Sequence, residues 1–166
     1  MLARFPELQP YLSHADHLDV KSIQARTRLR PFIAGMLAYH PWWINALYHL
    51  REILVYLLGL EKHEQPDRRS SIAPQSLPFT PGGTASFFTV KCAREEHYWV
   101  AQTPPDKHLT AFLGVTAEPL ASGAVRFSVF TAVRYLHWTG PVYFNLIRPF
   151  HHLVVRCMMK AGSKTI

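Results

Sequence analysis

The sequence predicts an α+β domain in which a curved antiparallel sheet is closed by a long C-terminal helix, with two shorter helices near the N-terminus. The main evidence lies in the last quarter of the chain. Residues 124–137 alternate between apolar and polar side chains, a short break follows at Thr139-Gly140-Pro141, and an amphipathic pattern then reaches about Ala161. A period of two is typical of a half-buried strand, whereas three- and four-residue steps are typical of a helix.

The first element is a short strand within residues 14–23. Leu18 and Val20 alternate there with His17, Asp19 and Lys21. Such a short alternation is typical of a strand at or near the edge of a sheet.

Two helices follow. Pro41 suits the first position of a helix, where no backbone N–H is needed. After it, apolar side chains recur every three or four residues until Gly59: Trp43, Leu47, Leu50, Leu54, Leu57 and Leu58. A shorter apolar segment from Pro31 to Tyr39 precedes this helix and must end at His40, because a residue before proline is forced out of the helical region.

Residues 61–83 differ in composition from their neighbours, with four prolines, several charged residues and the pair Gly82-Gly83. Such a segment is typical of a connector. We therefore expect one domain over residues 1–166 with a flexible proline-rich connector at about 61–83.

Four strands follow the connector. Phe88, Val90 and Cys92 share one face of the first, which forms a hairpin with a strand at 98–102. Two longer strands carry their apolar residues at odd positions, over 109–117 and 125–133, and the turn Ala121-Ser122-Gly123 separates them. These two are expected to pair antiparallel and to share an apolar face.

The last helix has an apolar side and a basic side. We expect the following residues to face the sheet: Tyr143, Ile147, Phe150, His151, Val154, Met158 and Ala161. Arg148, His152, Arg156 and Lys160, four apart, form a ridge that is expected to face solvent.

Composition narrows the functional classes. The chain has 48% hydrophobic, 13% aromatic and 17% charged residues, which is too apolar for a disordered protein and favours a large core or an apolar pocket. The net charge of +7 comes from basic residues that are spread along the chain. Without a cluster of basic residues, we expect no nucleic-acid partner.

Other signals are absent from the sequence. The longest apolar run, from Ile53 to Leu60, is far shorter than the roughly 20 residues of a membrane span. No secretion signal is visible, which predicts a cytoplasmic protein. These observations still allow weak peripheral contact with a membrane. The two cysteines, Cys92 and Cys157, and the adjacent His151-His152 lack the spacing of a metal site, so neither metal nor cofactor is expected.

The order of these elements resembles the START-like (SRPBCC) superfamily that includes the birch-pollen allergen. Several short motifs are also similar to a bacterial family of unknown function: Pro41-Trp42-Trp43, Leu50-Arg51-Glu52, Leu58-Gly59-Leu60, residues 106–109 and Arg148-Pro149-Phe150-His151. The resemblance covers about residues 14–162. It implies a helix-grip fold with an apolar cavity. That family also occurs C-terminal to short-chain-dehydrogenase-like sequences, whose Gly-rich phosphate loop is not found here. The helix-grip fold usually has seven strands, whereas five are visible in this sequence.

The candidate catalytic residues are Asp106, His108 and His151. Asp106 and His108 are two apart at the start of a strand, so both would project to one face, where a carboxylate can orient an imidazole as a general base. His151 lies within the apolar stripe of the last helix. The alternative is that Asp106 belongs to a turn, His108 is an edge residue and His151 is a satisfied core histidine.

The candidate ligand-binding residues are Arg51, Trp99, Phe127, Tyr143, Ile147 and His151. Arg51 interrupts an apolar helix and would reach a carboxylate, unless it is paired at the surface. The aromatic residues would line a cavity, unless they belong to an ordinary core.

Three functions stay open on these grounds. The first is binding of a small apolar, aromatic or lipid-like molecule in an internal cavity. The second is a cyclase, hydratase or isomerase on the same fold. The third is an interaction module, accessory to a dehydrogenase-like partner, that docks through Trp42 or Trp138.

Overall fold

The computed structural model describes residues 4–57, 72–104 and 108–165. Six antiparallel strands form one sheet in the order β1-β6-β5-β4-β3-β2. Their bounds are β1 His17–Ala25, β2 Thr84–Ala85, β3 Phe88–Arg94, β4 Tyr98–Gln102, β5 Leu109–Pro119 and β6 Val125–Tyr135. The helices are η2 Pro6–Leu8, α1 Gln9–Leu12, α2 Leu29–Leu37, α3 Trp42–Leu57, η3 Pro74–Ser76 and α4 Thr139–Gly162. The predicted fold class, the edge position of β1 and the β5–β6 pair are confirmed.

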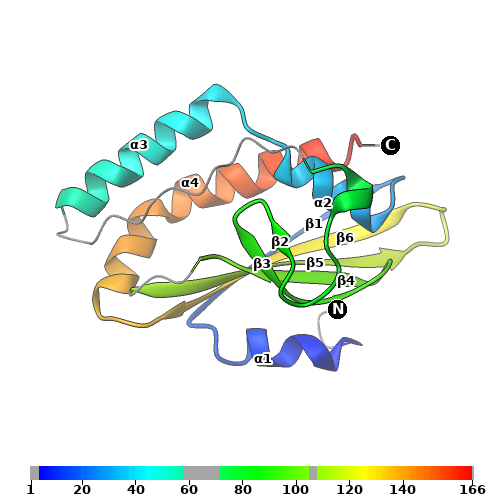
Figure 1. Cartoon of the computed structure of the whole chain (residues 1–166), viewed down its shortest axis with the longest axis horizontal. Coiled ribbons are helices and arrows are strands. Elements are labelled where there is room, and N and C mark those ends of the chain that lie inside the picture. Colours follow the sequence, from blue (N-terminus) through cyan, green and yellow to red (C-terminus); the bar gives the residue numbers. More distant parts are fainter. Residues whose placement is uncertain (1–3, 58–71, 105–107, 166) are drawn as a thin grey trace.

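Helices cover both faces of the sheet, as Figure 1 shows. On the inner face, α2 and α4 lie over the strands and α3 lies beyond α4, farther from the sheet. On the outer face, η2 and α1 pack on the central strands through Leu8, which is fully buried with Phe130 and Val100. The sequence pattern did not predict η2, α1 or the two-residue strand β2, because segments this short show no periodicity.

The two faces have separate apolar cores. Inner-face side chains of β3 to β6 pack with α2 and α4, and outer-face side chains pack with η2 and α1. Phe88 and Val90 belong to the inner core, but Cys92 lies in the outer one. The prediction that these three share one face is wrong, because the register with β4 shifts between Val90 and Cys92. A bulge of this kind inserts one residue and turns the next side chains over.

The buried side of α4 is rotated from the predicted stripe. Its buried residues are Gly140, Tyr143, Phe144, Val155, Met159 and Gly162, whereas Phe150 is 40% exposed. The second half of α4 packs against α2 as well as the sheet, which draws Val155 and Met159 inward. Phe150 consequently turns toward solvent, contrary to the prediction.

Two glycines let α2 and α4 approach closely. A Cβ atom on Gly162 would lie 2.4 Å from the backbone oxygen of Phe32, and one on Gly35 would lie 3.0 Å from the Cα of Gly162. Side chains at these positions would push the helices apart. The close approach places Phe32 on the sheet, where its ring stacks on Phe127 with centroids 4.0 Å apart.

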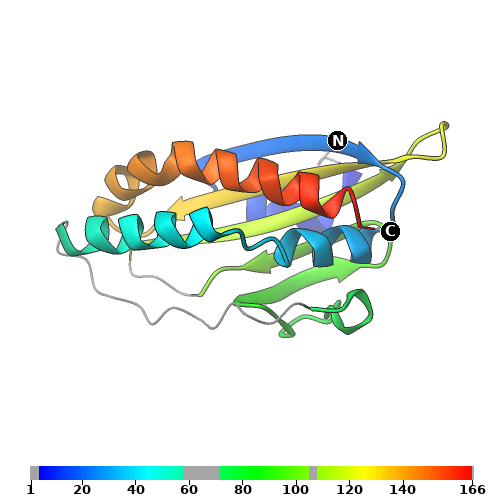
Figure 2. The same cartoon turned by 90° about the horizontal axis from the view of Figure 1, so that it is seen from above.

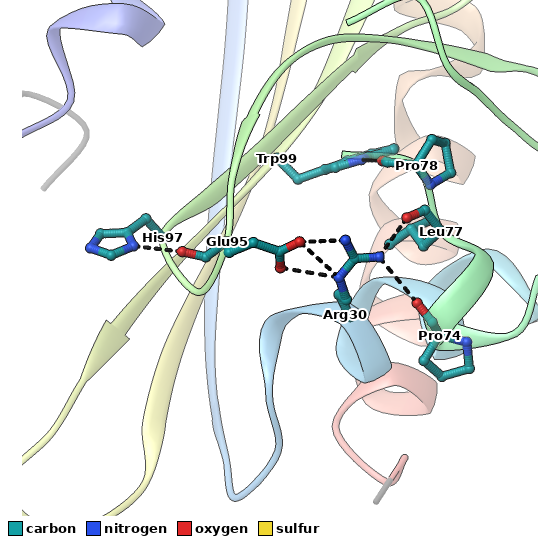
Figure 3. A network of polar contacts seen from close by, with 7 residues as sticks. All are labelled: Arg30, Pro74, Leu77, Pro78, Glu95, His97 and Trp99. Atoms are coloured by element: carbon teal, nitrogen blue, oxygen red, sulfur yellow. Dashed lines mark hydrogen bonds and ion pairs between the residues drawn. The ribbon is translucent and has the colours of Figure 1, made fainter. Parts of the chain in front are cut away.

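A polar network fixes residues 72–83 to the rest of the fold, as Figure 3 shows. Arg30 of α2 donates through Nε to both carboxylate oxygens of Glu95 at 3.0 Å and through a terminal nitrogen to the Leu77 backbone oxygen at 2.6 Å. Trp99 donates from Nε1 to the Pro78 oxygen at 3.0 Å. Leu77 is buried in the inner core. Residues 61–71 of the expected connector lie outside the described residues, but the remainder is anchored at these points.

Candidate functional site

Strand β1 turns its polar side chains toward the inside of the fold. His17, Asp19 and Lys21 are half-buried and face α4, whereas Leu18 and Val20 are 43% and 45% exposed on the outer face. Pairing with β6 sets this orientation, since His17 lies opposite Val133 and Lys21 opposite Val129. A strand that only filled a core would have the reverse pattern. Breaks in local rules of this kind concentrate at functional sites.

The three polar side chains of β1 lie against residues of α4 and β6. Together they form what we call the β1–α4 polar cluster: His17, Asp19, Lys21, Thr131, His151 and His152. Asp19 forms an ion pair with Lys21. The same carboxylate oxygen lies 3.1 Å from Nδ1 of His152. Arg148 donates from Nε to Nε2 of His152 at 3.4 Å. Nδ1 of His152 also lies 2.8 Å from Nζ of Lys21, so both ring nitrogens of His152 face cationic donors and Nδ1 lies next to the Asp19 carboxylate as well.

His151 lies under α4 at the centre of this region. Its Nε2 is 3.2 Å from the Thr131 hydroxyl. Burial lowers the pKa of His151 to about 4, and His152, Lys21 and His17 act in the same direction. The imidazole is therefore neutral near pH 7, because burial disfavours the charged form.

The pKa values of His17, His152 and Lys21 are lowered as well. Burial, followed by the positive charge of Arg148, lowers the pKa of His17. Burial, followed by Lys21, lowers the pKa of His152. For Lys21 itself, burial and the charge of Arg156 lower the pKa. The region is thus electropositive and partly withdrawn from water.

Among the described residues, Nε2 of His17 has no hydrogen-bond partner although it is buried. The ring packs against Phe144, with centroids 4.9 Å apart. A buried polar group without a partner costs on the order of 1–3 kcal/mol. This cost marks His17 as the least satisfied member of the cluster.

Of the predicted ligand-binding residues, Tyr143, Ile147 and His151 come together. They follow each other at four-residue intervals on the side of α4 that faces the sheet, with Tyr143 buried and the other two half-buried. The side chain of Arg51 and all of Asp106 lie outside the described residues.

Trp99 and Phe127 occupy a different place. Both are fully buried in the inner core, where Phe127 stacks on Phe32 and Trp99 is tied to Pro78. This end of the sheet, beneath α2, is filled with side chains.

His108 lies at the corner where the chain enters α4. Its Nδ1 is 2.7 Å from the hydroxyl of Thr139, and its backbone oxygen accepts from the amide of Leu136. His151 lies 12 residues beyond Thr139 on the same helix, which corresponds to roughly 18 Å of helical rise. The two imidazoles therefore serve different places, and one bridging water would not join them.

Asp19, Lys21, His152 and Thr131 were missed as functional candidates. The alternation in β1 is visible in the sequence, but which set of side chains faces inward depends on its pairing with β6. His152 appeared only as part of a solvent-facing basic ridge.

The described residues contain no group of three or more His, Cys, Asp or Glu side chains arranged to hold a metal ion. Within the same part of the chain, no helix has the length and hydropathy needed to span a membrane.

Comparison with known proteins gives a family without an assigned activity. No curated protein matches the chain. Among solved structures, Ara h 8.0201 aligns with a TM-score of 0.44 and 8% identity over 88% of this chain and 97% of its own. A hypothetical protein from Helicobacter pylori, jhp0584, aligns with a TM-score of 0.45 and 12% identity over 97% of this chain and 95% of its own. A family model matches residues 11–158, and the chain therefore belongs to the family described as Protein of unknown function (DUF2867).

Proposed function

We propose that the protein binds a small apolar molecule, lipid-like or aromatic, between β5 and the helices at the end of the sheet where α4 begins. The observation that carries the proposal is a change of burial along one strand. On the inner face of β5, Leu113, Val115 and Ala117 are buried, whereas Leu109 and Ala111 are only half-buried. Apolar side chains beneath a helical layer that keep contact with solvent are typical of a binding site.

The helices above this end are also apolar on the side that faces the sheet. Ile147 of α4 is half-buried there. Figure 2 shows α3 running beside the first half of α4, above this end of the sheet. A bound apolar molecule would remove from water the apolar surface that is still exposed on the sheet and on the helices. This removal favours binding.

Acid–base catalysis has weaker support. A general base works best with a pKa near the working pH, and burial holds the pKa of His151 at about 4. Lys21 and Arg148 direct donors at the two ring nitrogens of His152. The β1–α4 polar cluster therefore suits hydrogen bonding and charge placement better than proton transfer.

A filling substitution tests the binding site. Ala111→Phe places a ring on the inner face of β5 at its half-buried end, and the matched control Ala121→Phe adds the same ring in the exposed β5–β6 turn. Titration with the fluorescent probe anilinonaphthalene sulfonate should show saturable binding to the unmodified chain. We expect binding to be about tenfold weaker or more in Ala111→Phe and unchanged in the control.

Native mass spectrometry of the purified protein supplies a second readout, because a co-purifying molecule would be lost from Ala111→Phe alone. Absence of saturable probe binding, or equal binding by both variants, would overturn the proposal. Thermal unfolding of each variant separates a filled site from a damaged fold.

A further inference from the structure

Helix α4 exposes an apolar row on the side away from the sheet. Val142, Leu146, Phe150 and Leu153 are 47%, 45%, 40% and 50% exposed. Their spacing of four, four and three residues places them along one face of the helix. Single exposed apolar side chains are ordinary in proteins, but a continuous row marks a surface that contacts something else.

Helix α3 extends this surface. Trp42, Ile53 and Tyr56 are 81%, 55% and 74% exposed, and α3 lies beside α4 on the side away from the sheet (Figures 1 and 2). Trp138, which precedes α4, is 76% exposed. We call these eight residues the helical apolar patch: Trp42, Ile53, Tyr56, Trp138, Val142, Leu146, Phe150 and Leu153.

The charged side chains of α4 have one sign. Helix α4 contains no Asp or Glu, and its exposed charged residues are Arg148, Arg156 and Lys160. Arg156 and Lys160 lie three and seven residues beyond Leu153, which places them beside the apolar row. Arg148 lies on the side of β1, where it donates to His152. The whole chain carries a net charge of +7.

We propose that the helical apolar patch docks on an anionic lipid surface. A helix with an exposed apolar row, adjacent cations and no acids has the composition of helices that lie in the membrane interface. Indole rings such as those of Trp42 and Trp138 partition to the level of the lipid headgroups. Cations beside the row are attracted to the negative surface potential of the bilayer. The proposal concerns surface attachment and does not require a ligand within the fold.

Vesicle flotation tests it. The unmodified chain should float with vesicles of phosphatidylcholine mixed with phosphatidylglycerol and much less with phosphatidylcholine alone, and added salt should weaken the binding. The double variant Leu146→Ser/Leu153→Ser should lose about tenfold or more of this binding, because it removes apolar contact with the lipid chains.

The chain offers matched controls. Leu18→Ser/Val20→Ser changes two side chains of similar exposure on the outer face of β1, so binding should stay unchanged. For charge, Arg156→Gln/Lys160→Gln should weaken binding to anionic vesicles, whereas Arg26→Gln/Arg28→Gln, which removes two exposed cations outside the helices, should have a smaller effect.

Three results would overturn the proposal. They are absence of flotation with anionic vesicles, equal losses in patch and control variants, and a self-association that Leu146→Ser/Leu153→Ser abolishes. The last result would assign the patch to a second copy of the chain. Probe binding at Ala111 is measured without vesicles, so failure of one proposal is distinguishable from failure of the other.

Discussion

The two ends of the sheet are built from the same strands but differ in packing. Under α2, Phe32 stacks on Phe127, and glycines bring α2 and α4 into contact. Under α3, Leu109 and Ala111 stay half-buried. The difference lies in the helix overhead, since α2 lies close to the strands and α3 lies farther from them, beside α4 (Figures 1 and 2). One strand can therefore supply a rigid core at one end and an accessible apolar surface at the other.

The largest effect is expected at the packed end. Phe127→Ala should lower the free energy of unfolding by about 3–5 kcal/mol, because it removes a fully buried ring and leaves a cavity. Urea denaturation followed by circular dichroism measures the change. A loss below 1 kcal/mol, within the ordinary range for surface substitutions, would show that this end is not the rigid one.

An intermediate effect is expected from His151, which lies between the sheet and α4. Its pKa is about 6.5 in the unfolded chain and about 4 in the fold, so the folded state binds fewer protons between these values. Its contribution to stability is present above pH 6.5 and is lost as the pH falls toward 4.

Between pH 7 and pH 5 the loss from this group amounts to about 2 kcal/mol. His151→Gln, which keeps a donor for Thr131, should reduce the acid-side loss of stability by that amount in denaturation curves at the two pH values. His14→Gln, at an exposed histidine, is the control. Equal pH dependence in the unmodified protein and in His151→Gln would contradict this account.

The smallest effect is expected at the exposed row of α4. Phe150→Ala deletes the same ring as Phe127→Ala, but its side chain is 40% exposed. The expected loss is about 1 kcal/mol or less, measured in the same denaturation experiment. If the two Phe→Ala variants lose similar stability, the contrast between a packed region and an exposed one fails.

The sequence predicted the long helices and strands better than it predicted which face of each one is buried. β5, β6, α3 and α4 show enough periods to be recognised, and their order predicted the fold class. The bulge after Val90 and the rotation of α4 that exposes Phe150 come from contacts with distant residues, which a local pattern does not contain.

The same limit explains which residues of the candidate site could be predicted from the sequence. His151 was found because an imidazole interrupts an apolar stripe. Asp19 and Lys21 were not, because apolar residues are expected to face the core and β1 does the opposite. Its outer face is left uncovered by η2 and α1, which pack on the central strands instead. Only the pairing with β6 shows which way these side chains turn.

That pairing has a consequence for folding of the protein. β1 precedes β6 in the chain by about a hundred residues, yet β6 is its one neighbour among the described strands, and His17 pairs with Val133. Contacts this distant along the chain form slowly, because a long loop must close first. The strand that carries Asp19 and Lys21 therefore stays unpaired, with Leu18 and Val20 accessible to chaperones, until β6 has been translated.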